Sequence, residues 1–536
     1  MKKNYFKSQH NVKCLVVFFL LLLNGMFGIS KASNLTVANA FLMGKNASAG
    51  TNHASNFQVI KFDISWDNSF RLAADASNYD AVWVFAKYRI ATTNGGDGIW
   101  KHATLATTGF VAPAGSALTP TSDGMGAFIY RATPGANGKI SWKGVQLQWN
   151  YGTNGVDDNA VVEIKVFGIE MINVPEGNFF VGTGANPAEV SSFTKANVTL
   201  EATAPFEITS AKLTMQGNNL GSNEKNLAAR SYWDLIGLVS DTLSNTYPTG
   251  HKEFYCMKYE ITQQQYVDFL NTLTLAQQTK RTATPPTSTV GTGALVADNA
   301  YRNGIDIMKS AILPATPAEY GCNMNGNTVA AETGDGKEIA CNWLSWADLT
   351  AYFDWSGIRP MTELEFEKAC RGGLSPVAGE YAWGNTVINQ YTGVIETSTT
   401  DKTAGKKPNC CYGNNASVQG PVAVDLFETT VPNRVNNGAT YYGIMNMSGN
   451  VYERVVALGS KIGKKFNGAN GNGMLNPQGI ADVPTWPGAD AEGSGFKGGT
   501  WYSAAAYLRV SDRSGANLAS AHRLNTTGGR GVRSAK

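Results

Sequence analysis

The stretch from Phe496 to Ala535 decides the fold prediction and reads FKGGTWYSAAAYLRVSDRSGANLASAHRLNTTGGRGVRSA. It is rich in small residues and contains arginines at intervals, among them Arg509, Arg513, Arg523 and Arg533. Guanidinium groups can join loops through paired contacts with carboxylates and carbonyls. The stretch therefore favours a loop-rich domain in which these arginines are structural, and a polar substrate groove is the alternative.

Five earlier segments belong to the same pattern. They are Val174–Phe179 (VPEGNF), His251–Leu270 (HKEFYCMKYEITQQQYVDFL), Leu344–Gly373 (LSWADLTAYFDWSGIRPMTELEFEKACRGG), Tyr381–Asn385 (YAWGN) and Asn446–Glu453 (NMSGNVYE). Together with the closing stretch, they resemble in the same order the motifs of the formylglycine-generating enzyme superfamily, also called the sulfatase-modifying factor family. The resemblance covers residues 171–536 and implies a loop-rich α+β domain with a C-type-lectin-like fold.

The family's catalytic members carry a pair of copper-binding cysteines that this chain lacks. In the catalytic members of the family, a Gly-Gly-Ser/Thr-aromatic turn leads into two cysteines that bind copper(I). Here residues 498–501 keep the turn, but the two cysteine positions hold Ser503 and Leu508. Neither side chain supplies a thiolate to a soft metal. No copper is expected, and the chain is expected to be non-catalytic.

Three short helices are predicted by N-cap spacing. Thr262 is followed by Gln265, Ser345 by Asp348, and Thr362 by Glu365, which is the spacing of a capping box or close to it. Apolar residues then recur at helical spacing, which indicates that these helices face the core. The last helix is expected to end at Gly372 and Gly373 in a left-handed C-cap.

The amino terminus reads as a secretory signal peptide over residues 1–32. Lysines precede the apolar run from Leu15 to Leu23, and Ser30 and Ala32 have the spacing of a cleavage site. The run is too short for a transmembrane anchor.

Of the 44 Lys and Arg residues of the chain, five lie in this segment of residues 1–32, which has no acidic residue, so 39 basic residues remain against 41 acidic ones. The near-neutral balance gives no indication of nucleic-acid binding.

Residues 34–168 are predicted to form an all-antiparallel β-sandwich. Apolar and polar residues alternate over 60–66, 145–151 and 162–166, and the apolar run Ala81–Ala86 predicts a central strand buried on both faces. Five tryptophans in this region suggest either core packing or a carbohydrate platform, and packing is favoured. They are Trp66, Trp83, Trp100, Trp142 and Trp149.

An insertion at about 187–250 is expected to pack on the family domain of residues 171–536. Six cysteines follow the signal segment, and an exported protein can oxidise them. Cys322 and Cys341 flank a polar excursion and are the favoured pair, while Cys410 and Cys411 are adjacent. The five histidines are scattered and lack the three-histidine set that iron-dependent relatives carry, so no iron is expected.

One metal site follows from the resemblance. The family's Asn-x-x-Gly-Asn-x-aromatic-Glu motif binds calcium through its end side chains and through carbonyls between them. In this chain the ligands would be the side chains of Asn446 and Glu453 with the carbonyls of Gly449 and Val451. The alternative is that Asn446 and Glu453 tie the loop together by hydrogen bonds.

Two classes of function remain open. In the first, the chain is an exported bacterial envelope protein that binds a protein partner or a glycan. The resemblance supports this, because relatives without the cysteine pair occur as components of bacterial gliding and secretion systems. It would lie in the periplasm, on the outer membrane or outside the cell, and the loops Lys280–Gly304 and Gly459–Gly495 would be its contact surfaces. In the second, it is a divergent enzyme with a non-standard metal site or a hydrolase-like activity near Ser503, although no His and acid can be placed beside Ser503 as a triad.

Overall fold

The structure is a computed structural model. It describes residues 34–535 except 76, 93–94, 185–188, 190, 197–203, 217–225, 230–240, 331, 394–406 and 429–433. The predicted signal segment, residues 1–32, lies outside the described residues. Within the described part of the chain, no helix is both long and apolar enough to cross a bilayer.

The chain begins with a three-stranded antiparallel sheet in the order β1 (Thr36–Asn46), β2 (Phe57–Phe70) and β7 (Asn137–Trp149). In β2 the predicted alternation is present, because Ile60, Phe62, Ile64 and Trp66 are buried and their neighbours are not. These side chains share one apolar cluster with residues of the second sheet. The two sheets therefore face each other across a common core.

The second sheet has seven strands in the order β21–β15–β8–β3–β6–β5, with β4 beside β3. Its strands are β3 (Asp80–Ile90), β4 (Lys101–His102), β5 (Ser116–Pro120), β6 (Ala127–Arg131), β8 (Val162–Val174), β15 (Phe254–Met257) and β21 (Val532–Ser534). The central strand β3 is buried on both faces: Val82 and Val84 contribute to the core between the two sheets, and Trp83 and Phe85 to the core on the other side. The predicted central strand is confirmed.

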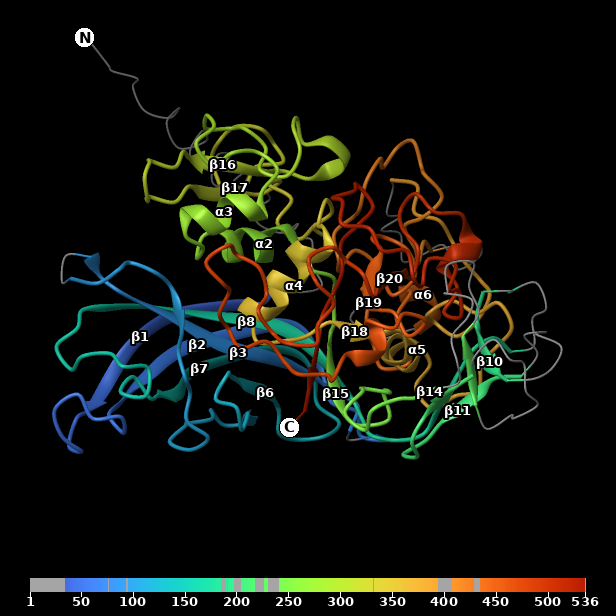
Figure 1. Cartoon of the computed structure of the whole chain (residues 1–536), viewed down its shortest axis with the longest axis horizontal. Helices are drawn as coiled ribbons and strands as arrows, with labels where there is room; N and C mark the ends of the chain where they lie inside the picture. Colours follow the sequence, from blue (N-terminus) through green and yellow to red (C-terminus); the bar gives the residue numbers. More distant parts are fainter. Residues whose placement is uncertain are drawn as a thin grey trace, which may run out of the picture.

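Strand β8 runs through residues 168–171, where the sequence predicts a boundary between two domains. Its first part pairs with β3, and its last residues pair with β15, as in the pair Val174 and Phe254. β15 in turn pairs with β21 at the end of the chain. Figure 1 shows this sheet continuing from the blue amino-terminal strands into the green and red strands. The sequence segments 34–168 and 171–536 thus contribute to one sheet.

Short helices cover the family part of the chain: α2 (Gln263–Leu270), α3 (Leu275–Arg281), α4 (Trp346–Trp355), α5 (Glu363–Arg371) and α6 (Arg434–Asn437), with the 3-10 turns η2 (Ala300–Arg302), η3 (Gly463–Lys465) and η4 (Ala505–Leu508). The three predicted capping boxes are present at the starts of α2, α4 and α5. A fourth, formed by Thr274 and Gln277, starts α3 and was missed although its spacing is the same. Gly372 ends α5 with a positive φ of 66°, but its ψ of −143° lies outside the left-handed helical region expected for that cap.

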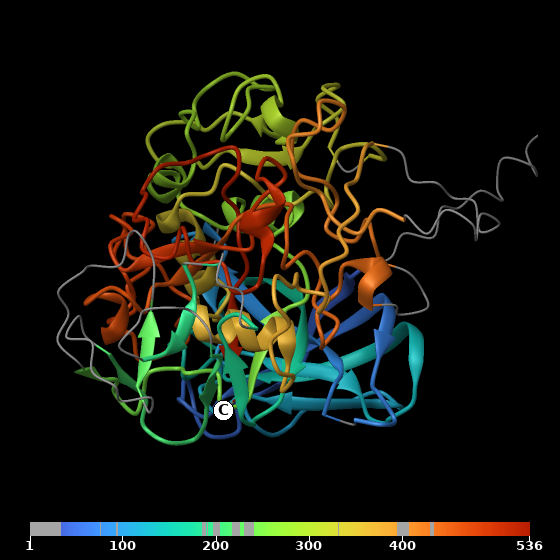
Figure 2. The same cartoon turned by 90° about the vertical axis from the view of Figure 1, so that its right-hand side faces the viewer.

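The remaining strands are short: β9 (Phe179–Val181), β10 (Phe193–Lys195), β11 (Phe206–Ile208), β12 (Thr214–Met215), β13 (Leu227–Ala229), β14 (Asp241–Thr242), β16 (Ile305–Lys309), β17 (Glu319–Cys322), β18 (Met361–Thr362), β19 (Glu453–Val456) and β20 (Ser494–Lys497). The sheet β10–β13–β12–β14 lies within the predicted insertion. Its buried residues Phe193, Met215 and Leu227 belong to the main apolar cluster of the family part. Figures 1 and 2 both place the amino-terminal sheets on one side of the molecule and β16 with β17 on the opposite side.

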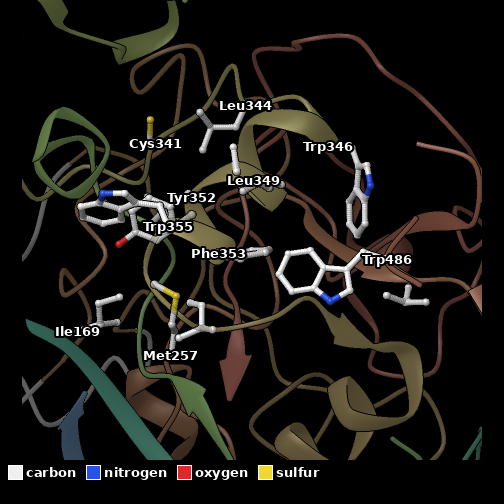
Figure 3. Packing of buried hydrophobic residues seen from close by; sticks show 14 of the residues in the cluster. Ile169, Met257, Cys341, Leu344, Trp346, Leu349, Tyr352, Phe353, Trp355 and Trp486 are labelled. Atoms are coloured by element: carbon white, nitrogen blue, oxygen red, sulfur yellow. The ribbon is translucent and has the colours of Figure 1, made fainter. Parts of the chain in front are cut away.

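Helix α4 occupies the middle of the main core, and all ten of its residues are buried. Figure 3 shows Tyr352 and Trp355 on the side of Ile169 and Met257, while Trp346 lies with Trp486 on the other side. The indole of Trp346 donates a hydrogen bond to the Pro487 carbonyl at 3.0 Å. One short helix therefore joins β8 and β15 to the loop that contains Trp486.

The structure decides two expectations, one about the tryptophans of residues 34–168 and one about a disulfide. Trp66, Trp83 and Trp149 are at most 1% exposed, so these tryptophans are core residues and not a carbohydrate platform. The disulfide expected between Cys322 and Cys341 is not formed, because all six described cysteines are free and buried. Burial raises the pKa of all six thiols, which keeps them protonated and unreactive.

Candidate functional site

The turn of residues 498–501 leaves β20 and leads into η4. Gly498 and Gly499 have φ values of 82° and 68°, a region that glycine occupies without steric cost. A Cβ on Gly499 would lie 2.6 Å from Leu508 Cδ1. Glycine is therefore required here both for the backbone conformation and for close packing against η4.

The two positions that correspond to the family's cysteines have different environments. Leu508 is fully buried in an apolar cluster with Phe366 and Val455. Ser503 is partly exposed, and its hydroxyl lies 3.0 Å from Thr500 Oγ1 and accepts a hydrogen bond from the Thr500 amide at 3.1 Å. Leu508 is thus part of the hydrophobic core, and the Ser503 hydroxyl stabilises the turn.

Exposed aromatic side chains surround this turn. Tyr502 is 57% exposed and Tyr507 is 47% exposed. The buried indole of Trp501 contacts both Tyr502 and Tyr301, with ring centroids 5.6 Å apart in each pair. Tyr301 is itself 41% exposed and contacts Trp343. We call Tyr301, Trp343, Tyr502 and Tyr507 the aromatic surface.

The predicted calcium motif lies in a buried polar network. Asn446 Nδ2 donates to Glu260 Oε2 at 3.1 Å and to the Val424 carbonyl at 2.7 Å. Glu453 Oε1 accepts a hydrogen bond from Arg530 Nε at 2.6 Å, and the Arg530 guanidinium also faces Glu260. The structure brings Asn446 and Glu453 together through two residues, Glu260 and Arg530, that sequence analysis did not single out as site residues.

Two carboxylates share one guanidinium in this network, and both are fully buried. Burial raises the pKa of Glu260 to about 8, although Arg530 acts to lower it. Burial also raises the pKa of Glu453 against the effect of Arg530. Glu260 Oε1 and Glu453 Oε2 have no hydrogen-bond partner among the described residues. These two oxygens are thus available to a cation or a proton.

The four arginines that sequence analysis singled out are all paired with carboxylates, namely Arg509 with Glu189, Arg513 with Glu363, Arg523 with Asp348, and Arg533 with Asp123. Each of these pairs joins segments that are far apart in sequence. These ion pairs agree with the structural interpretation of the four arginines.

The two predicted contact loops differ in how they are held. In loop 280–304, Tyr301 contributes to the aromatic surface and Val290 is 50% exposed. Loop 459–495 is anchored to the core by the buried side chains of Phe466 and Trp486. No group of three or more His, Cys, Asp or Glu that could hold a metal ion occurs among the described residues.

Comparison with known proteins identifies the family. A family model described as a sulfatase-modifying factor enzyme 1-like domain matches residues 246–535, more than half of the chain. The chain belongs to this family. The resemblance inferred from the sequence motifs is confirmed, and membership implies the C-type-lectin-like fold of sulfatase-modifying factors.

Individual relatives match over a shorter stretch. The formylglycine-generating enzyme of Mus musculus is 34% identical over 113 residues, which is 20% of this chain and 25% of that enzyme. The enzyme of Thermomonospora curvata is 32% identical over 111 residues, 20% of this chain and 30% of that enzyme. A mouse protein named inactive C-alpha-formylglycine-generating enzyme 2 is 33% identical over 116 residues, 22% of this chain and 31% of its own length. The matched region thus spans less than a third of each of these relatives.

Among solved structures, Treponema denticola variable protein 1 is similar at 13% sequence identity with a TM-score of 0.31. The match covers 69% of this chain and 96% of that chain.

Proposed function

We propose that this member of the sulfatase-modifying factor family is a non-catalytic, exported protein of the bacterial cell envelope. It binds an envelope or secreted protein partner, or a glycan, through the aromatic surface. The observation that carries the proposal is the pair of residues at the cysteine positions. Ser503 and Leu508 offer no thiolate, and exposed tyrosines that can bind a partner lie beside them.

Tyrosines at this position are suited to binding. A tyrosine buries a large apolar ring at low entropic cost and keeps a hydroxyl for hydrogen bonding. Tyr502 directly follows the turn of residues 498–501, which the Ser503 hydroxyl stabilises. Tyr507 lies in η4 beside the buried Leu508. Export is supported by the signal segment predicted over residues 1–32.

The test is capture of partners from the native envelope under mild cross-linking. We expect the wild-type protein to retain a stoichiometric partner and the Tyr502→Ala/Tyr507→Ala variant to lose it. Phe41→Ala is the matched control, because Phe41 is an exposed aromatic residue of β1, 48% accessible and outside the aromatic surface. Equal capture by all three proteins, or by none, would contradict the proposed binding surface.

The enzymatic alternative is tested in parallel with copper(I) and a cysteine-containing peptide. We expect no conversion of the peptide cysteine to an aldehyde, measured by mass spectrometry. A Ser503→Cys/Leu508→Cys variant should also fail to bind copper(I), because residue 508 is buried in an apolar cluster. Turnover by the wild-type protein would favour the divergent enzyme.

We further propose calcium at the Asn446–Glu453 motif, with the carbonyls of Gly449 and Val451 as additional ligands. Calcium is bound by compact sets of carboxylate, amide and carbonyl oxygens. The proposal is supported by Glu453 Oε2 and Glu260 Oε1, two buried carboxylate oxygens without a hydrogen-bond partner among the described residues. The alternative is that a proton on Glu260, and not calcium, stabilises these two oxygens. A calcium titration at different pH values distinguishes the proton from the ion.

A further inference from the structure

A hollow of about 470 Å³ lies next to the aromatic surface and is lined by basic residues. Lys280 and Arg281 enter it from the last turn of α3, and His522 and Arg523 enter it from the closing stretch. Trp343 contributes to its wall and also belongs to the aromatic surface. The volume is within the range of small-molecule sites, roughly 300–1,000 Å³.

This basic hollow has more positive than negative side chains. The carboxylate that its arginines contact is Asp348, which is fully buried. Arg523 holds Asp348 through two bonds of 2.8 Å, and Arg281 Nη1 lies 3.0 Å from Asp348 Oδ1. Lys280 is exposed and forms no ion pair with any described residue. The Asp348 carboxylate thus pairs with two arginines, and Lys280 adds a further cation to the lining, so the hollow carries a net positive charge.

Part of the Arg281 side chain also lacks a hydrogen bond. Arg281 is only 5% exposed, its Nε has no hydrogen-bond partner among the described residues, and its Nη1 has only the ion pair with Asp348. Lys280 and Arg281 lie in the last turn of α3, where cations offset the negative end of the helix dipole. The helix dipole does not explain why Arg523 lies here as well, since Arg523 is more than 240 residues away in sequence and donates to the carbonyls of Lys280 and Thr282. The convergence of these cations is therefore a property of the tertiary site.

Trp343 is held in an unusual backbone conformation beside these cations. Its φ is +59°, and Tyr301, whose ring it contacts, has a φ of +53°. Bulky residues rarely adopt this region, and such strain persists where surrounding contacts impose it. The Trp343 amide donates to the Leu524 carbonyl at 3.0 Å, which ties the tryptophan to the closing stretch. A partly exposed indole is thus fixed at the wall of a basic hollow.

We propose that the basic hollow binds an acidic sugar residue of a glycan. Its carboxylate or sulfate group would pair with Lys280 beside the arginines, and its ring would pack its apolar face on Trp343. A pyranose ring with an apolar C–H face and an anionic substituent matches both features, whereas an acidic peptide side chain matches the cations alone. The proposal rests on the proposed binding function and specifies the ligand class next to the aromatic surface.

The test uses trigalacturonate as the anionic probe, with maltotriose as the neutral sugar and hexaglutamate as the acidic peptide, each titrated into the full-length protein by calorimetry. We expect trigalacturonate to bind and the other two to bind at least tenfold more weakly. Lys280→Gln should weaken trigalacturonate binding by about tenfold, and higher salt should weaken it further. Lys309→Gln is the matched control, since Lys309 is an exposed lysine on β16 outside the basic hollow.

Trp343→Leu tests the stacking contact separately from charge, and its fold is checked by circular dichroism. If this variant does not fold, equal affinities of trigalacturonate and hexaglutamate for the wild type would by themselves overturn the sugar assignment. Absence of trigalacturonate binding would overturn it as well. Retained capture of a protein partner in that case would leave the proposed binding function standing, whereas loss of both results would remove both proposals.

Discussion

At the scale of single residues, ion pairs between buried side chains place charged groups inside the core. Arg513 and Glu363 are both fully buried, and two bonds of 2.9 Å join them. Glu363 Oε2 also accepts a hydrogen bond from the Leu458 amide. Removing the arginine would leave the Glu363 carboxylate without its charge partner in the interior.

We therefore expect Arg513→Met to lower the free energy of unfolding by about 3–5 kcal/mol. The control is Lys309→Met, which breaks an exposed pair with Glu319 and should cost less than about 1 kcal/mol. Urea titration followed by circular dichroism measures both changes. Losses of equal size would show that burial does not decide the effect.

Glu260 predicts how stability depends on pH. Its pKa in the folded protein is about 8, above the ordinary value of 4.5. Between these values the folded protein keeps a proton that the unfolded chain releases, so the free energy of unfolding falls as pH rises and levels off above about pH 8. In EGTA, Glu260→Gln should flatten the Tm profile over this interval. An unchanged profile would contradict the assignment.

Calcium should act on the same carboxylates in the opposite direction. Because the ion competes with the proton, added calcium should raise the Tm more at pH 8.5 than at pH 6. Glu453→Gln should abolish this increase. If calcium leaves the Tm unchanged at both pH values, the proton and Arg530 suffice and the calcium proposal fails.

At the scale of elements, the helices begin where the sequence places their caps. Thr262, Ser345 and Thr362 each accept a hydrogen bond from the amide three residues later. This geometry involves four consecutive residues, so it can be predicted from spacing alone. Helix α3 carries the same signal, because Thr274 stands three residues before Gln277 and forms a capping box with it.

Helix α3 offers a test of its cap with a control in the same helix. Thr274→Ala removes the cap and should lower the free energy of unfolding by about 1 kcal/mol. Thr279→Ala, in the middle of the helix, removes only a bond to the Leu275 carbonyl and should be neutral or slightly stabilising. Chemical denaturation compares the two, and equal losses would contradict the capping argument.

At the scale of the whole molecule, the amino-terminal sheets and the family domain share buried contacts. Trp83 of β3 donates to the Ser356 carbonyl at 2.8 Å, and the Arg533 guanidinium lies over its ring. Lys87, also buried on β3, donates to the carbonyls of Trp355 and Gly473. Burial holds the pKa of Lys87 well below its usual value. Side chains of residues 34–168 thus donate hydrogen bonds to backbone carbonyls of residues 171–536.

A truncated chain that begins at Met171 should therefore not fold by itself. It would lose β3, cut β8, and expose the main apolar cluster to which Trp83, Phe85 and Phe128 contribute. We expect an aggregating product without a cooperative thermal transition, measured by gel filtration and calorimetry. A soluble fragment with a sharp transition would show that the family domain is independent.

The sequence by itself determined the features that depend on near neighbours. Helix starts follow from four-residue spacing, the buried strand β3 from its apolar run, and family membership from motifs in a fixed order. The tertiary structure alone decided which distant residues meet. Arg530 reaches Glu453 across 77 positions, and Arg523 reaches Asp348 across 175. Such pairs depend on the path of the loops, because a charge can pair with any complementary group that the folded chain brings within a few ångströms.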